Sequence, residues 1–411
     1  MSLTFRVVLI TAFLSAGLFA QSWRGTIGGI ISDSSLNAIS GAAIRLTHVE
    51  TQRERTARSD SNGEFTIASL PPGDYRLKVT RDGYRKHVVS ISLLVNHEVR
   101  IDVPLLPGKF TEEITVTGTH ELLKADSAAI TTVLENRKIT QLPLNGRNFY
   151  ELSLLAPGVL PAAPGSAGSV RGDFAIHVNG AREDGNYFVL DGVYNSDPKL
   201  NGVAVTPSVD AIREFEVLTS TYDASFGRNA GAQVNVVLKS GTNQVHGTAY
   251  EFFRNAALDA RNAFAPGSEP DPRYQRNQFG FSLGGPVIKN RTFFFGDYEG
   301  RRSAEGITRV TNVPTALERQ GDFSQSGQPP IDLFTQQPFP GNRIPAERIH
   351  PIGRAIANLY PLPNRNVPGA NFVSSPAQRD DTNNFDVRLD HSISANSDLA
   401  IRYSFSRLLK F

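Results

Sequence analysis

The chain has 411 residues, and its 42 Lys and Arg residues nearly balance 40 Asp and Glu residues. This length allows about two or three domains. The balanced charge, with no basic cluster along the chain, argues against nucleic acid as a partner. Cysteine is absent, which excludes disulfides, thiol catalysis and cysteine-based zinc sites. The 35 Gly and 25 Pro residues are typical of turn-rich β structure.

The first twenty residues have the three-part layout of a secretory signal peptide. Arg6 precedes an apolar run from Val7 to Phe13, and small residues follow up to Ala20. We therefore expect residues 1–20 to be a signal peptide, because the alternative, a membrane anchor, would need more apolar residues. No later stretch reaches about 18 uninterrupted apolar residues. An exported chain of this kind can enter a membrane only with β structure, since helices and closed barrels alone satisfy the backbone in lipid.

Residues 21–106 contain short runs rich in Val, Ile, Thr or Tyr, separated by turn sequences with Asp, Asn, Pro and Gly. The runs are 25–32, 42–49, 63–70, 74–81, 87–93 and 98–105. Their length and spacing predict an antiparallel β-sandwich.

The words SGAAIRL and DSNGEFTIASLPPGDYRLKV in this stretch resemble the carboxypeptidase regulatory-like domain. That resemblance implies a transthyretin/Ig-like sandwich with a carbohydrate-binding-like fold, and no peptidase activity, because the catalytic domain of that family is separate. Asp60, Asn62 and Glu64 begin like a calcium loop, but the Glu expected at the twelfth position is missing. We expect a plain hairpin turn there, and neither a metal nor a cofactor in the chain.

Residues 107–120 form a linker whose centre is extended and β-branched. Such a segment can add as a strand to the sheet of a partner. The word EEITVTG resembles the TonB box, the periplasmic segment of TonB-dependent receptors that an inner-membrane energy-coupling complex pulls. The resemblance implies a coupling role, and an ordinary interdomain strand is the alternative. The segment consists of Glu113, Ile114, Thr115, Val116 and Thr117.

Residues 121–238 resemble the plug domain of the same receptors, in the wording of the Oar-like subgroup. The words that carry the resemblance are LPLNGRNF, VNGAREDGNYFVLDGV and NAGAQVNVVLKSGTN, with GAQVNV where GGVINI is more common. The resemblance implies a small α+β domain. Asn195 and Asp197, in the loop after VLDGV, are candidate ligand-binding residues, and plain solvated loop polarity is the alternative.

Residues 239–411 alternate polar and apolar side chains, as membrane β-strands do. The runs are 244–255, 276–287, 290–300, 305–313, 384–391 and 399–407. A soluble amphipathic sheet would alternate in the same way, but large aromatic residues opposite charged ones favour a lipid face and a lumen. The Pro-, Asn- and Gly-rich stretch 314–378 is expected to be a long extracellular loop.

These runs amount to about six strands of an antiparallel, incomplete barrel, whereas a plugged receptor needs about 22. An open set of strands leaves two edges that lipid cannot satisfy. From this count we expect the N-terminal fragment of a longer receptor, not competent for transport alone.

The sequence thus predicts a mainly β protein of the outer membrane that serves in energy-coupled uptake of a ligand. The expected partners are the TonB-type inner-membrane complex, outer-membrane lipid and an extracellular carbohydrate, siderophore or peptide. A secreted or periplasmic carbohydrate-binding or interaction module without transport is the alternative. We do not expect an enzyme, because the chain has no GxSxG, P-loop or metal motif.

Overall fold

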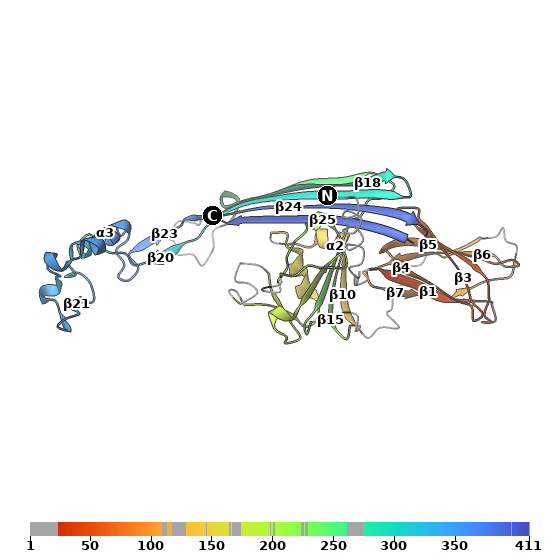
Figure 1. Ribbon diagram of the computed structural model, residues 1–411, viewed down its shortest axis with the longest axis horizontal. Helices are drawn as coiled ribbons and strands as arrows, with labels where there is room; N and C mark the ends of the chain where they lie inside the picture. Colours follow the sequence, from red (N-terminus) through yellow and green to blue (C-terminus); the bar gives the residue numbers. More distant parts are fainter. Residues whose placement is uncertain are drawn as a thin grey trace, which may run out of the picture. The chain divides into compact units, whose positions relative to one another are not determined.

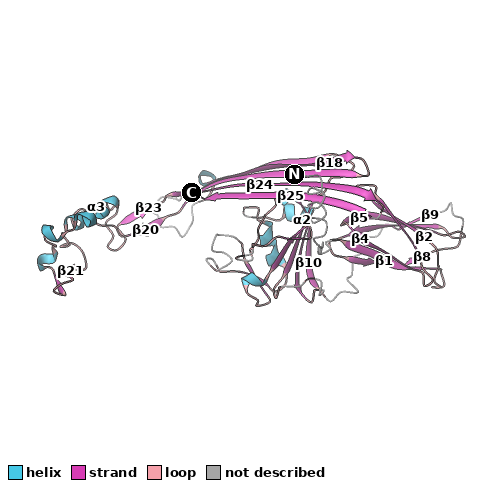
Figure 2. Ribbon diagram, in the orientation of Figure 1, coloured by secondary structure: helices cyan, strands magenta, loops and turns pink. Residues whose placement is uncertain are grey.

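The computed structural model divides into two compact units, which are described separately. The first unit consists of Met1–Tyr250, Phe279–Glu299 and Asn383–Arg407, and the second consists of Glu251–Gln278, Gly300–Thr382 and Leu408–Phe411. The described residues are 24–108, 113–116, 129–144, 146–163, 166, 174–197, 199, 202–222, 226, 229–260, 274–395 and 397–410. The predicted signal peptide, residues 1–20, and Thr117 of the predicted coupling segment lie outside them. Strands dominate throughout (Figure 2).

The N-terminal domain is a sandwich of two sheets (Figure 1). One sheet has the order β3-β2-β5-β6-β9, and the other has the order β4-β1-β7 with β8 also paired to β1. The strands are β1 (Gly25–Ser32), β2 (Ala43–His48), β3 (Glu54–Arg58), β4 (Glu64–Leu70), β5 (Gly73–Thr80), β6 (Lys86–Leu93), β7 (Glu98–Arg100), β8 (Val103–Pro104) and β9 (Glu113–Val116). The predicted antiparallel sandwich is therefore partly mixed, since β7 and β8 pair with β1, and β9 with β6, in parallel.

Alternation along the strands builds the core of the sandwich. Ile44 and Leu46 in β2, and Leu77 and Val79 in β5, are at most 1% exposed, and the register pairs Leu46 with Leu77. Each buried aliphatic side chain of this size contributes about 1.5–3 kcal/mol relative to exposure. The residues between them are partly or fully exposed, so the apolar side chains of these strands lie on one face of the sheet.

Strand β3 was not among the predicted runs, because its sequence ERTAR contains three charged residues and lies at a sheet edge. The turn that follows β3 connects it to β4 in the other sheet. This turn is therefore a corner of the sandwich and not a hairpin. Gly63 adopts a φ of +75° there. The Asp60 carboxylate accepts hydrogen bonds from the backbone N–H groups of Asn62 (2.9 Å) and Glu64 (2.8 Å). This side chain therefore closes the turn.

The middle domain is a small α+β unit around a sheet of order β10-β15-β16-β13-β14. Its strands are β10 (Ile130–Glu135), β11 (Val159–Pro161), β12 (Ile176–Val178), β13 (Tyr187–Leu190), β14 (Val193–Tyr194), β15 (Ile212–Ser220) and β16 (Gln233–Leu238), and its helices are α2 (Asn136–Gln141), η1 (Phe149–Leu155), η3 (Glu183–Gly185) and η4 (Val209–Ala211). All six residues of β16 are buried. Phe149 and Phe215, both 0% exposed, pack edge to face with ring centroids 5.5 Å apart at the centre of the core.

The third architectural element is a sheet of long strands in the order β17-β18-β19-β24-β25 (Figure 1). Its strands are β17 (His246–Asn255), β18 (Tyr274–Ile288), β19 (Thr292–Gly306), β24 (Ala377–Ser394) and β25 (Ser397–Lys410). Each strand has 10 to 18 residues. A β-strand needs about 9–11 residues to cross the hydrocarbon core of a membrane, so these strands are long enough to do so.

Within the described residues this sheet has five strands, one fewer than the six runs in the sequence. The run 305–313 is divided between the end of β19 and β20 (Arg309–Thr311), which pairs with β23 (Phe372–Ser374) in a separate small sheet. The alternating pattern alone could not reveal that β20 belongs to a separate sheet, because its partner β23 lies about sixty residues further along the chain.

The stretch expected as a loop contains short ordered elements. They are η6 (Glu318–Gln320), β21 (Ile331–Asp332), β22 (Gln337–Pro338), η7 (Pro340–Asn342), η8 (Ala346–Arg348) and α3 (Pro351–Leu359), and η5 (Ala256–Leu258) follows β17. The Asp332 carboxylate pairs with the Arg348 guanidinium at 2.9 Å, and the same guanidinium lies 5.1 Å from the Phe334 ring centroid. These contacts give the stretch local order without a regular sequence period.

The fold class predicted from the sequence is confirmed: the protein is mainly β, with an N-terminal sandwich, a small α+β domain and long antiparallel strands. Among the described residues, no helix combines the length and the apolar character needed to cross a membrane.

Candidate functional site

The predicted coupling segment lies on the N-terminal sandwich. As β9, Glu113–Val116 is extended and runs parallel to β6 at the end of the five-stranded sheet. The paired residues are Lys86 and Glu113, His87 and Ile114, Val88 and Thr115, and Val89 and Val116. The strand form agrees with the extended segment expected from the sequence, and its role in coupling stays a prediction.

The two candidate ligand residues lie in one loop of the middle domain. Asn195 is 6% exposed, and its side-chain amide binds the backbone of Val205 twice, donating to the carbonyl at 2.8 Å and accepting from the N–H at 3.0 Å. Asp197 Oδ1 accepts from the backbone N–H of Lys199 at 2.6 Å. Both side chains organise their own loop, and a role in binding ligand stays a prediction.

The VLDGV turn places a carboxylate between two arginines of the long-stranded sheet. Asp191 and Gly192 have φ angles of +48° and +77°, which makes the tight turn between β13 and β14. The Asp191 carboxylate lies 3.3 Å from Arg388 of β24 and 3.3 Å from Arg402 of β25, and it accepts from the backbone N–H of Leu238 at 3.0 Å. Only the tertiary structure brings Asp191 together with these arginines, because Arg388 lies 197 residues further along the chain.

The inner face of the long-stranded sheet is largely polar and is buried against the middle domain, although Phe295 of β19 packs into the apolar core of that domain. Asp386 is 1% exposed, and Asp297 and Arg388 are each 5% exposed. Asp297 accepts a hydrogen bond of 2.7 Å from Ser208 in the middle domain. Opposite them, aromatic and aliphatic side chains point outward, with Phe281 and Ile401 each 54% exposed. A sheet with polar residues inside and apolar residues outside has the polarity of a membrane β-barrel wall.

The sandwich also contacts the middle domain through buried carboxylates. Glu214 accepts a 2.7 Å hydrogen bond from the backbone N–H of Val95, and Glu216 accepts a 3.1 Å bond from the Asn96 side chain. Burial raises the pKa of Glu214 to about 7, against the lowering effect of the Val95 N–H and of Arg213. A carboxyl with this pKa changes its protonation state near neutral pH, so this contact depends on pH.

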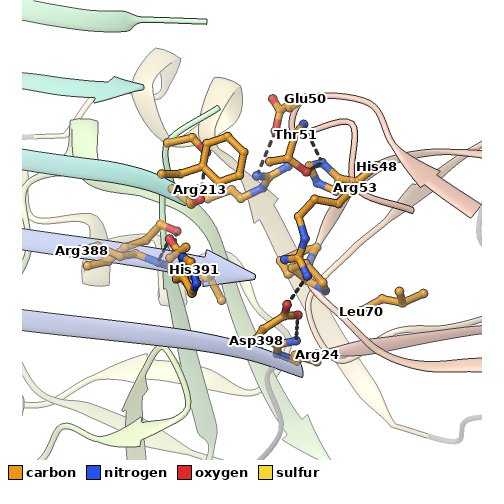
Figure 3. A pocket seen from close by; sticks show the side chains of 18 of the residues that line it. Arg24, His48, Glu50, Thr51, Arg53, Leu70, Arg213, Arg388, His391 and Asp398 are labelled. Atoms are coloured by element: carbon orange, nitrogen blue, oxygen red, sulfur yellow. Dashed lines mark hydrogen bonds and ion pairs between the residues drawn. The ribbon is translucent and has the colours of Figure 1, made fainter. Parts of the chain in front are cut away.

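Three arginines of the sandwich converge on one carboxylate at the start of β25. The Asp398 side chain, 7% exposed, lies 3.1 Å from Arg24 and 3.0 Å from Arg55, and it is also bound by Arg53. Figure 3 shows Arg24 and Arg53 directed toward Asp398, with Arg213 and Glu50 paired at 3.3 Å on the other side of the pocket. The sequence alone does not reveal this cluster, because Asp398 lies more than three hundred residues from the three arginines.

The pocket beside this cluster has a volume of about 70 Å³ and is bordered by the sandwich, the end of β16 and the ends of β24 and β25 (Figure 3). His48 lines it, and burial lowers the pKa of this imidazole to about 4, so His48 is neutral at pH 7. The pocket therefore lies where the sandwich meets the ends of these strands.

A small α+β domain therefore lies against the polar face of a sheet whose other face is apolar. Residues 26–106 match the family described as carboxypeptidase regulatory-like domain, and residues 237–410 match the family described as outer membrane beta barrel domain. The localisation predicted from the sequence, the outer membrane, is confirmed by this match and by the relatives described next.

The chain is a homologue of the TonB-dependent outer-membrane transporters, as its wording predicted. It is 26% identical over 322 residues to the TonB-dependent transporter Oar of Myxococcus xanthus, covering 75% of this chain and 29% of that protein. It is 23% identical over 238 residues to the probable TonB-dependent siderophore receptor PirA of Acinetobacter baumannii, covering 54% of this chain and 29% of the relative. The crystal structure of the siderophore receptor PirA from Acinetobacter baumannii aligns with a TM-score of 0.40 and 17% identity, covering 72% of this chain and 34% of that one. The chain thus spans less than a third of the length of the two curated relatives.

Proposed function

We propose that this chain serves in TonB-dependent, energy-coupled uptake of a ligand across the outer membrane, with residues 121–238 as the plug. The observation that carries the proposal is the Asp191 carboxylate held between Arg388 and Arg402. These ion pairs fix the middle domain to the polar face of the membrane sheet, which is the position of a plug. The coupling segment, Glu113–Thr117, precedes that domain in the chain.

In this function the protein works by moving a plug and makes or breaks no bond in its ligand. A pull on the coupling segment would reach the plug through the linker that follows it. Releasing the plug requires separating Asp191 from two guanidiniums and exposing them to water. Water in the opened lumen can solvate these charges again, so the contact is strong in the closed state and reversible when the plug moves.

The ligand we propose is an extracellular carbohydrate, siderophore or peptide. A relative named as a siderophore receptor supports the siderophore class. The carbohydrate class rests on the carbohydrate-binding-like fold that the sequence resemblance of residues 21–106 implies. Asn195 and Asp197 remain the candidate contacts. Because Asn195 already binds the Val205 backbone, a ligand would meet this loop as a preformed surface.

The coupling role is tested by binding of the 411-residue chain in detergent to the purified periplasmic domain of a TonB-type protein. Ile114→Pro removes a backbone N–H from the segment and should weaken binding at least tenfold. Thr56→Pro in strand β3, at the opposite edge of the same sheet, is the matched control and should leave the affinity unchanged. Equal affinities of the wild type and Ile114→Pro would refute the coupling role.

The alternative function, a secreted binding module without transport, predicts a different behaviour. After expression with export, such a module would be found in the soluble periplasmic fraction. The proposed function predicts that the chain sediments with outer-membrane lipid instead, because the outward face of the long-stranded sheet is apolar.

A further inference from the structure

Three arginines of the N-terminal sandwich, Arg24, Arg53 and Arg55, form a cluster at one end of the domain, here called the arginine cluster. Arg53 immediately precedes β3 and Arg55 is the second residue of that strand, so the two side chains point to the same side. Arg24 immediately precedes β1, which belongs to the other sheet. All three reach the Asp398 carboxylate of β25, and their side chains are only 15–22% exposed. Cations from both sheets of the sandwich therefore converge on one carboxylate.

The hydrogen-bond donors of the arginine cluster exceed what Asp398 can accept. A guanidinium has about five N–H donors, whereas a carboxylate has about four acceptor sites. Arg24 also donates to the Ser69 carbonyl at 3.0 Å, which uses only one further donor. Guanidiniums held this close repel one another, and the limited access of water leaves that repulsion weakly screened. A second anion beside Asp398 would accept several of these hydrogen bonds and reduce the repulsion.

The pocket beside the arginine cluster has a positively charged border. Besides the cluster, Arg213 of β15 and Arg388 of β24 border it. Among the described residues on this border, these five arginines face three carboxylates, Asp398, Glu50 and Asp390. Each carboxylate is already held by an arginine, since Glu50 lies 3.3 Å from Arg213 (Figure 3) and Asp390 lies 2.9 Å from Arg388. The pocket is therefore suited to an anion.

We propose that this pocket binds a phosphate oxyanion, which the arginine cluster holds beside Asp398. The planar guanidinium fork matches the oxygens of a phosphate and can bind two of them at once. The anion is either inorganic phosphate or the phosphate of a lipid headgroup. The lipid source is included because Leu399, which also borders the pocket, is 45% exposed and lies on the same outward face as Ile401. The bound anion stabilises the junction between the sandwich and β25, whether or not the chain takes up a ligand.

Calorimetric titration of the 411-residue chain with sodium phosphate, in a maltoside detergent, tests the site. Sodium chloride keeps the ionic strength constant, so the heat reports a preference for the oxyanion over chloride. The wild type should bind phosphate saturably. Arg53→Gln removes one guanidinium of the cluster and should weaken binding about tenfold, because hydrogen bonds to a charged group are lost. Arg45→Gln is the matched control: its side chain lies on the same domain, is 59% exposed and does not border the pocket, so the affinity should not change.

A parallel titration with dihexanoyl phosphatidylglycerol, a short-chain lipid, distinguishes the two sources of the anion. Binding of inorganic phosphate that Arg53→Gln weakens supports the free anion as ligand. Binding of the lipid alone, weakened by the same substitution, supports the headgroup. If Arg53→Gln does not fold, Arg55→Gln removes another guanidinium of the cluster and should have the same effect. Absence of binding by both probes, or equal affinities of the wild type and the arginine variants, would overturn the proposal.

Discussion

The sandwich and the long-stranded sheet use the same alternating pattern with opposite polarity. In β2 and β5 the apolar residues face inward, and Leu46 and Leu77 are 0% exposed. In the long strands the charged residues face inward, with Asp386 1% exposed, while Phe281 points outward at 54%. A period of two therefore specifies a sheet with two different faces, and the surrounding solvent determines which of the two faces is buried.

The two kinds of interior are also held together differently. The sandwich core consists of aliphatic and aromatic side chains packed against one another, which is non-directional. Against the long strands, the middle domain is held by directed contacts, above all Asp191 with Arg388 and Arg402. Apolar packing resists unfolding, whereas the ion pairs between the middle domain and the long strands can be broken and remade when water enters. Four changes of sequence or conditions test this distinction.

A charge placed in the apolar interior should have the largest effect. Leu77→Arg buries a cation where the wild-type side chain is 0% exposed, and we expect a loss of about 4 kcal/mol or more in the free energy of unfolding. Thermal unfolding followed by circular dichroism, with limited proteolysis of residues 24–108, measures it. Lys78→Arg, at the adjacent partly exposed position, is the control. If the Leu77→Arg variant melts at the wild-type temperature, that result would contradict an apolar interior.

Removing the charge from the polar interior should cost slightly less. Asp191→Asn keeps the shape of the side chain but leaves Arg388 and Arg402 without this carboxylate, and we expect a loss of about 3–5 kcal/mol. Protease protection of the middle domain in detergent is the measurement. Asp184→Asn removes a half-exposed carboxylate, 48% exposed, and should change little. Equal protection of both variants would show that the Asp191 contact does not hold the domain.

A charge on the outward face should leave the sandwich and the middle domain intact and reduce association with lipid. Phe281 lies at the middle of the 15-residue strand β18, and Phe281→Arg should cost about 2–4 kcal/mol on transfer into a bilayer. Flotation of the refolded chain with phosphatidylcholine vesicles measures the bound fraction, and Phe281→Leu is the control. If both variants float equally well, the outward face does not meet lipid.

The smallest effect concerns pH. The pKa of Glu214 is about 7 in the folded protein and 4.5 in the reference state, so the folded state holds the proton more tightly. This contribution is fully present below pH 4.5 and is lost as the pH rises to about 7, by at most about 3 kcal/mol. His48, with its pKa lowered to about 4, acts in the opposite direction, because its contribution grows as the pH rises from about 4 to 6.5.

Comparing the wild type with Glu214→Gln isolates the Glu214 contribution. The difference in unfolding free energy between them should fall as the pH rises from 4.5 to 7, while the His48 contribution cancels. Denaturant unfolding of the 411-residue chain at several pH values gives this difference. Glu135 and Glu216 also raise the pKa of Glu214, so Glu216→Gln should shift the fall to slightly lower pH. A difference that does not change with pH would contradict the assignment.

Much of the local structure followed from sequence alone. Turn residues and β-branched runs located most sandwich strands, and alternation located most of the long ones, because both signals are written within a few neighbouring residues. Strand β3 was missed because ERTAR has the composition of a solvated edge. The run 305–313 was assigned to the wall because its true partner, β23, is distant in the chain.

The class of each segment can be read from the sequence: a sandwich, an α+β domain, a membrane-type set of strands and an extended segment between the first two. Which charges meet, such as Asp398 with Arg24, Arg53 and Arg55, and which sheet edge carries the predicted coupling segment emerge only from the three-dimensional fold. The two kinds of information differ in the distance along the chain over which they act. Propensity, period and turn chemistry act over a few residues, whereas ion pairs and sheet pairing join positions up to several hundred residues apart.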